Sequence, residues 1–166
     1  MLTITERALD GTEAQDRLIL PFEQRRKSRL RVRLESGDEA ALLMERGTTL
    51  RDGDRLQAED GTIVIVVAAN EAVTTVTAAD PLGLLLAAYH LGNRHVPLEV
   101  GPGWIRLEQD HVLEHMLEHL GVSLRHESAP FEPESGAYGG GHHHHHDDDG
   151  EHAHGHDRHH HDHEKP

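Results

Sequence analysis

Hydrophobic and polar residues alternate along short stretches in the first seventy positions of the chain. The strictest alternation lies at 29–34, where Leu30, Val32 and Leu34 are separated by arginines. Successive side chains of a strand point to opposite faces, so this pattern predicts a half-buried strand with a charged outer face. A β-branched run at 62–67 predicts another strand, with both faces buried.

Turn signals divide this region into short pieces. Glycine stands next to aspartate at 37–38, 52–53 and 60–61, and weaker strand patterns lie at 17–22 and 40–44. Because no helical period interrupts these strands, the pattern predicts a small β-sandwich or barrel over residues 1–70.

The pattern changes in the second half, where two stretches have helical spacing. Asp80 and Pro81 are typical of a helix start, and the apolar residues that follow lead to an end at Gly92. Asp110 likewise precedes a second apolar stripe, which ends at Gly121. Strand patterns lie before, between and after these helices, at 71–77, 96–100, 104–107 and 122–126.

The resulting order is strand, helix, strand, strand, helix, strand, which is typical of a ferredoxin-like fold with both helices on one face of an antiparallel sheet. We therefore predict an α+β protein with a β-domain at 1–70, a ferredoxin-like βαββαβ domain at 71–135 and a disordered tail at 136–166. The tail lies outside the predicted folded part because almost no apolar residue follows Tyr138.

Composition excludes several classes of function. The formal net charge is −14 with neutral histidines, and the chain has no cysteine. The charge argues against a nucleic-acid partner, and the absence of cysteine excludes disulfides, thiolate metal sites and cysteine nucleophiles. The first residues do not resemble a signal peptide, and no apolar run approaches the roughly 20 residues of a membrane span. We therefore expect a cytoplasmic protein without a membrane partner.

One basic cluster stands apart from this acidic background. Arg25, Arg26 and Lys27 are followed by the arginines of the 29–34 stretch. Such a cluster is either the solvated face of a strand or a docking surface for an acidic partner. The sequence leaves both interpretations open.

The last part of the chain is rich in histidine, and twelve of the eighteen histidines lie there among aspartates and glutamates. These twelve are His142, His143, His144, His145, His146, His152, His154, His156, His159, His160, His161 and His163. Imidazole and carboxylate groups bind divalent first-row metals, so we predict a segment that gathers several ions loosely. Its irregular mixture with acidic residues distinguishes it from a purification tag.

Six histidines lie in the predicted folded part. His111, His115 and His119 recur every four residues, which places them on one stripe of the second helix. They either bind metal or form the solvent face of an amphipathic helix. His95 lies in the short loop between the first helix and Pro97, where it either binds metal or serves as a turn residue.

Several segments, taken in order, match a known pattern. They are Gly92-Asn-Arg-His95-Val-Pro-Leu98, Asp110-His111-Val-Leu113 and residues 130–138, with Leu50-Arg-Asp-Gly-Asp54 upstream and the histidine-rich tail downstream. Together they resemble the urease accessory metallochaperones of the UreE type, and the likeness spans essentially the whole chain.

The resemblance implies a cytoplasmic nickel carrier and not an enzyme. It implies a homodimer formed through the carboxy-terminal domain, in which His95 binds Ni²⁺ jointly with its twofold mate and His111 is a more peripheral ligand. It also implies an amino-terminal domain similar to a peptide-binding module, with the urease accessory GTPase and the urease apoprotein assembly as partners. A metal-bridged tetramer and binding of Zn²⁺ or Cu²⁺ are further expectations.

Some alternatives stay open in the sequence. Some relatives carry a histidine where this chain has Gln109, so His111 pairs either with His115 or with a histidine of the tail. An alternative function is storage or buffering of divalent metals, in which the tail alone performs the function. A metal-dependent hydrolase is disfavoured because the helical stripe lacks the His-Glu-x-x-His order.

Overall fold

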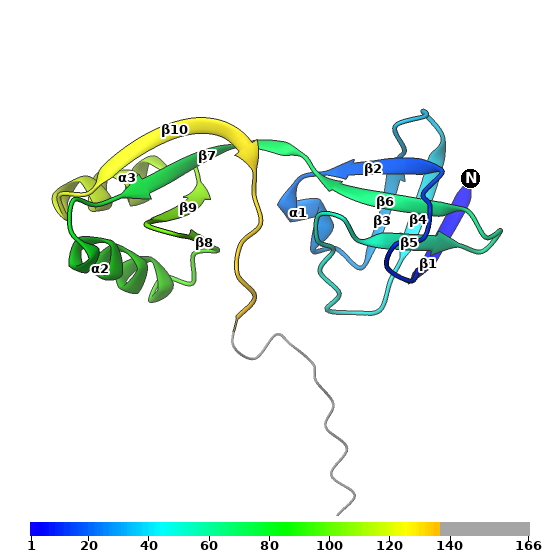
Figure 1. Ribbon diagram of the computed structural model, residues 1–166, viewed down its shortest axis with the longest axis horizontal. Helices are drawn as coiled ribbons and strands as arrows, with labels where there is room; N and C mark the ends of the chain where they lie inside the picture. The colour runs from blue at the N-terminus through cyan, green and yellow to red at the C-terminus, as the bar shows by residue number, and fades with distance from the viewer. Residues whose placement is uncertain (137–166) are drawn as a thin grey trace, which may run out of the picture. The chain divides into compact units, whose positions relative to one another are not determined.

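The first sheet has six strands and is nearly closed into a barrel (Figure 1). The computed structural model describes residues 1–136, and this sheet uses the first half of them. Its strands are β1 (Leu2–Arg7), β2 (Asp16–Leu20), β3 (Arg29–Arg33), β4 (Glu39–Leu43), β5 (Arg55–Ala58) and β6 (Ile63–Ala68), in the spatial order β2-β6-β5-β1-β4-β3. A short helix, α1 (Phe22–Arg25), connects β2 to β3.

One apolar core fills this sheet. Ile4, Leu18, Leu42, Leu56 and Val64 are all fully buried in it. The predicted alternation in β3 is confirmed, because the Val32 side chain is buried whereas the arginines on either side are exposed. In β6 only one face is fully buried, since Ile65 and Val67 stay half-buried, and the prediction of two buried faces is wrong to that extent.

The second sheet has four strands and two helices. The strands are β7 (Asn70–Thr77), β8 (Glu99–Gly101), β9 (Trp104–Glu108) and β10 (Ser123–Pro130), in the order β10-β7-β9-β8, and all neighbours are antiparallel. The helices are α2 (Pro81–Gly92), between β7 and β8, and α3 (His111–His119), between β9 and β10. This order of elements is the predicted one.

Both helices begin at the predicted aspartates. The Asp80 carboxylate accepts hydrogen bonds from two N–H groups of the first turn of α2, and Asp110 does the same for α3. These N–H groups have no partner within their own helix, so the carboxylate satisfies them and fixes the helix start. Leu91 of α2 and Leu117 of α3 share one core with Ile105 of β9, so both helices pack on the same face of the sheet.

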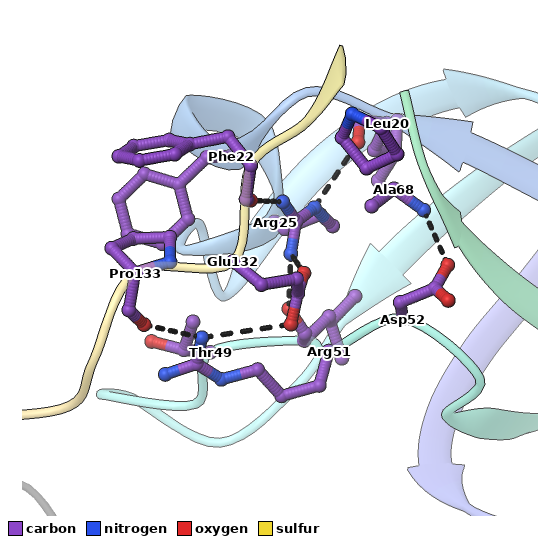
Figure 2. A network of polar contacts seen from close by, with 12 residues as sticks. Leu20, Phe22, Arg25, Thr49, Arg51, Asp52, Ala68, Glu132 and Pro133 are labelled. Carbon is purple, nitrogen blue, oxygen red and sulfur yellow. Dashed lines mark hydrogen bonds and ion pairs between the residues drawn. The ribbon is translucent and has the colours of Figure 1, made fainter. Parts of the chain in front are cut away.

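Arg25, the last residue of α1, lies fully buried in a network of polar contacts (Figure 2). Its Nε donates to the Leu20 carbonyl at 3.1 Å and its Nη1 to the Leu50 carbonyl at 3.3 Å. The guanidinium also forms an ion pair with Glu132 and donates to the Phe131 carbonyl. A buried charge is tolerated only when it is paired and its donors are used, and both conditions are met here.

The segment that follows β10 is held by further contacts. Arg51 Nη1 donates to the Pro133 carbonyl at 2.6 Å (Figure 2), and the rings of Phe22 and Phe131 meet edge to face with centroids 5.6 Å apart. The Glu134 N–H donates to the Leu98 carbonyl at 2.7 Å. Residues 131–134 therefore contact α1, the loop before β5 and the loop after α2.

Some elements differ from the sequence predictions. Strands β1 and β5 and the helix α1 were not among the predicted elements, and β10 runs to Pro130 instead of ending near residue 126. No helix within residues 1–136 has the length and apolar character needed to cross a bilayer. Apart from residue 136, the predicted tail lies outside the described residues, and so do its twelve histidines.

Candidate metal centre

His95 lies in a tight turn that terminates α2. The N–H groups of Asn93, Arg94 and His95 donate to the carbonyls of Tyr89, Leu91 and Gly92, at 3.0, 3.0 and 2.9 Å. His95 has a φ of 56°, in the left-handed region that residues with a β-carbon seldom adopt. Pro97 follows two residues later and favours extended backbone at the intervening residue. The turn thus presents an exposed imidazole on a constrained backbone.

His95 lines a cleft of about 310 Å³ between two segments of the chain. One wall is the loop 94–97, and the other is the segment 108–113 that joins β9 to α3. Glu108 and Asp110 line the same cleft as His95, and the Asp110 carboxylate also accepts the hydrogen bonds that begin α3. Two motifs that stand fifteen residues apart in the sequence, at His95 and Asp110, are therefore neighbours in space.

Glu108 is the titratable group of this cleft whose pKa is displaced. Burial raises the pKa of its carboxyl above the ordinary value of 4.5, and the nearby carboxylates of Glu71 and Glu23 raise it further, while Arg26 acts in the opposite direction. The Glu108 carboxyl therefore keeps its proton to a higher pH than an exposed glutamate does.

His111 is the first residue of α3 and its side chain is exposed. Gln109, two residues before His111, is bound to β7 through both its side chain and its backbone. Its Nε2 donates to the Val73 carbonyl at 3.3 Å, and its N–H donates to the Ala72 carbonyl at 3.2 Å. This anchoring to β7 fixes the approach to α3, so Gln109 supplies no ligand beside His111.

His115 is in contact with His119, one turn further along α3. Their ring centroids are 4.4 Å apart, and Nδ1 of His119 lies 2.7 Å from the His115 carbonyl oxygen. The expected choice between His115 and a tail histidine as the partner of His111 stays a prediction, because the tail is outside the described residues.

His126 has a partner that the sequence did not reveal. Its Nε2 lies 3.1 Å from Oε1 of Glu114 on α3, and the same carboxylate oxygen accepts a hydrogen bond from the Thr74 hydroxyl. Glu114 thus links α3 to the neighbouring strands β7 and β10. The carboxylate that precedes His115 therefore has a structural role.

Within residues 1–136 no three histidine, aspartate or glutamate side chains converge into a group that could hold a metal ion. The His95 imidazole is exposed and offers one nitrogen, the kind of ligand that suits divalent ions of the first transition row. A metal site at His95 would therefore need further ligands from outside the described part of this chain.

Comparison with known proteins decides the family. Residues 4–69 match the family model described as "UreE urease accessory protein, N-terminal domain", and residues 71–163 match that of "UreE urease accessory protein, C-terminal domain". The chain belongs to the UreE family of urease accessory proteins. UreE proteins are accessory chaperones and not enzymes, which confirms the expected absence of catalysis.

Individual UreE proteins are similar over most of this chain. The urease accessory protein UreE of Cupriavidus necator is 57% identical over 141 residues, which cover 85% of this chain and 68% of that protein. The UreE of Alkalilimnicola ehrlichii is 56% identical over 140 residues, or 84% of this chain and 86% of that protein. The UreE of Cupriavidus pinatubonensis is 57% identical over 141 residues, which cover 85% of this chain and 59% of that protein.

An uncovered apolar surface lies on the helix that leads to His95 in this UreE chain. Leu82, Leu85, Leu86 and Tyr89 of α2 are between 44 and 66% exposed. A groove of about 550 Å³ continues this surface between the start of α2 and the β8–β9 hairpin, where Leu84, Val100 and Trp104 line it. Such a contiguous apolar area on a single chain is typical of a protein–protein interface.

Proposed function

We propose that this protein is a nickel metallochaperone that delivers Ni²⁺ during maturation of the urease active site in the cytoplasm. Membership of a family of urease accessory proteins carries this proposal. The exposed imidazole of His95 is the group on the described part of the chain that is best suited to take up the ion. Nickel itself is inferred from the family resemblance, because nitrogen and oxygen ligands alone also suit copper and zinc.

We propose that two copies of the chain share this site across a twofold axis. The supporting observation is the apolar face of α2, which ends directly at the His95 turn. Pairing of two such faces would bury Leu85, Leu86 and Tyr89 and bring two His95 imidazoles together, since a twofold interface repeats the same contacts from both sides. The four-stranded order β10-β7-β9-β8 supports a ferredoxin-like domain as the dimerising unit.

In this proposal the two imidazoles fill only two of the coordination positions of the ion. Water, histidines of the tail or groups of the acceptor fill its other positions, so the ion can be exchanged and passed on. His111 serves as a peripheral ligand, together with His115 or a tail histidine. The tail, residues 136–166, collects ions in this proposal. The urease accessory GTPase and the urease apoprotein assembly are the proposed acceptors.

Nickel titration of four proteins tests the shared site. They are the full chain and the chain truncated after Gly141, each with and without His95→Gly. Glycine is chosen because it removes the imidazole and accepts the left-handed backbone of this turn. We expect truncation to lower the number of bound ions and to preserve the tightest site, and we expect His95→Gly to abolish that site in both backgrounds.

His126→Gln is the matched control, because it removes an imidazole from β10, outside the cleft. If the tightest site survived His95→Gly, or disappeared on truncation alone, the shared site would be rejected. A storage protein is the alternative, and urease activation in cells at limiting nickel separates the two. Deletion of the gene lowers activation if the protein delivers nickel and leaves it unchanged if the protein only stores the ion.

Pairing through α2 is tested separately. Leu85→Glu places a charge in the exposed apolar face without touching the core of the sheet, so the single chain should fold normally. We expect sedimentation to show a monomer and the nickel affinity of the tightest site to fall. A dimer of unchanged stability would show that α2 is not the interface.

A further inference from the structure

The first sheet carries a basic patch, formed by Lys27, Arg29, Arg31 and Arg46, that the proposed metal function does not use. All four side chains are exposed. Within residues 1–136 they form no ion pair or hydrogen bond, whereas every other arginine there does. Lys27, Arg29 and Arg46 line one concavity of about 450 Å³. Unpaired positive charge is thus concentrated in one place on a chain of net charge −14.

The backbone at this patch is also available for pairing. Strand β3 lies at the end of the six-stranded order and pairs only with β4. The Leu34 N–H donates to the Asp38 carbonyl, and the Met44 N–H donates to the Ser28 carbonyl. Hydrogen-bonded pairs alternate along an antiparallel ladder, so residues 28, 30, 32 and 34 of this strand bond to β4.

It follows that the backbone groups of the intervening residues face the open edge. Arg29 and Arg31 combine two features: their N–H and C=O groups point away from β4, and their guanidinium groups are unpaired. Arg33 differs because its guanidinium pairs with Glu39, and just beyond it the Glu35 N–H donates to the Arg17 carbonyl. The edge is therefore open at the Arg29 end and closed beyond Arg33.

We propose that this edge binds an extended acidic segment of a partner protein, which adds to the sheet as a further strand. Main-chain hydrogen bonds to Arg29 and Arg31 would provide affinity, as in other cases of strand addition. Residues directly opposite each other on neighbouring strands place their side chains on the same face. Carboxylates two positions apart in the partner would therefore meet the two guanidinium groups.

The charge of the whole protein selects this occupant. A nucleic acid would meet the basic patch but would be repelled by the acidic remainder of the chain. Arginines on an edge strand also discourage pairing with a neutral or basic strand, including a second copy of the same edge. An acidic strand satisfies both the backbone groups and the charges. This inference stands independently of the nickel site, because none of its residues lines the His95 cleft.

Binding of a labelled peptide to the full-length protein tests the proposal. The probe is Ser-Glu-Thr-Glu-Thr-Glu-Ser with blocked ends, and the controls are its glutamine version and a peptide of the same composition with three consecutive glutamates. We expect Arg29→Glu combined with Arg31→Glu to weaken binding of the probe at least about tenfold, since charged hydrogen bonds are lost and replaced by repulsion. Arg125→Glu, the same exchange at an exposed position of β10, should leave the affinity within about twofold.

Hydrogen exchange distinguishes strand addition from loose charge attraction. The amide protons of Arg29 and Arg31 should exchange more slowly when the peptide is bound. Unchanged exchange, equal binding of the clustered peptide, or unchanged affinity of the double variant would each overturn the proposal. If the double variant were unfolded, Arg46→Glu in the loop after β4 provides the second test, with a several-fold loss expected and unchanged affinity counting against the proposal.

The acidic residues of the same chain are the competing occupant. A full-length variant with Asp147→Asn, Asp148→Asn and Asp149→Asn tests whether these acidic residues occupy the edge. If the patch is free to receive a partner, this variant binds the probe as the wild type does. A marked rise in affinity would show that the chain's own acidic residues occupy the edge, and would overturn the assignment to a partner.

Discussion

Glu108 carries a carboxyl group that the fold makes harder to ionise. Its pKa is raised by burial and by the carboxylates of Glu71 and Glu23. A group that binds its proton more tightly in the folded state favours unfolding once it is ionised. The destabilisation is therefore absent well below the ordinary value of 4.5, and it develops as the pH rises through the raised pKa.

We predict that Glu108→Gln raises the free energy of unfolding at pH 7.5 and that the advantage shrinks towards pH 4. Glutamine keeps the size of the side chain and removes the charge. Urea unfolding in the presence of a chelator measures the effect without bound metal. Glu13→Gln, the same exchange at an exposed residue that has no part in the raised pKa of Glu108, should show no comparable gain. A variant that is less stable at both pH values would contradict the prediction.

Glu132 neutralises the buried guanidinium of Arg25 and is itself mostly shielded from solvent. We predict that Glu132→Ala lowers the free energy of unfolding by about 1.5–3 kcal/mol, because a buried cation loses its counter-charge but keeps its carbonyl partners. Glu134→Ala, two positions further on at an exposed site, is the matched control and should be nearly neutral. Chemical denaturation measures the free energy of unfolding of both variants. Equal values for Glu132→Ala and Glu134→Ala would show that the ion pair contributes little to stability.

The β8–β9 hairpin depends on a close contact between a glycine and an indole. Gly101 pairs with Trp104 across the turn, and a β-carbon at Gly101 would lie only 2.1 Å from an atom of the Trp104 ring. We predict that Gly101→Ala destabilises the protein by about 1–3 kcal/mol, since the ring must leave its position. Gly92→Ala is the control because its β-carbon meets nothing within 4 Å. Thermal unfolding compares the two, and a neutral Gly101→Ala would refute the contact.

The starts of helices α2 and α3 were the most predictable features of this chain, for a local reason. Asp80 and Asp110 accept hydrogen bonds from groups only two or three residues away, so the sequence alone contains the interaction. Strand β1 could not be found in this way, because its partners β4 and β5 lie far along the chain. The end of β10 was missed for the same reason, since Pro130 pairs with Asn70.

The turn that carries His95 was predictable from the sequence, but its surroundings were not. A histidine between a helix end and a proline marked the His95 turn, and the metal role that the family resemblance implies for this residue stays a proposal. The cleft around it joins two segments that only the fold brings together, and the raised pKa of Glu108 follows from that arrangement. The contact of His126 with Glu114 likewise depends on the packing of α3 beside β10, which no short motif encodes.

Nickel uptake by the whole protein should depend strongly on pH. Imidazole binds metal as the neutral base, with an unperturbed pKa of about 6.5. Binding to two protonated imidazoles releases two protons, so the affinity of the proposed shared site should fall about 100-fold for each pH unit in the acid range where both imidazoles are protonated. Calorimetric titration of the chain truncated after Gly141 measures the tightest site without the histidines of the tail. A fall of only about tenfold for each pH unit would indicate one imidazole, and hence no sharing between two chains.

The pairing of Arg25 with Glu132 also has a consequence for how the protein is made. The two residues are 107 positions apart, so at a translation rate of about 5–20 residues per second the arginine is synthesised roughly 5–20 s before its counter-charge. During that interval the barrel-like sheet can assemble its strands, but the cation at its end has only water and the carbonyls of Leu20 and Leu50 as partners. The first part of the chain to leave the ribosome therefore reaches its final stability only when the segment after β10 has been made.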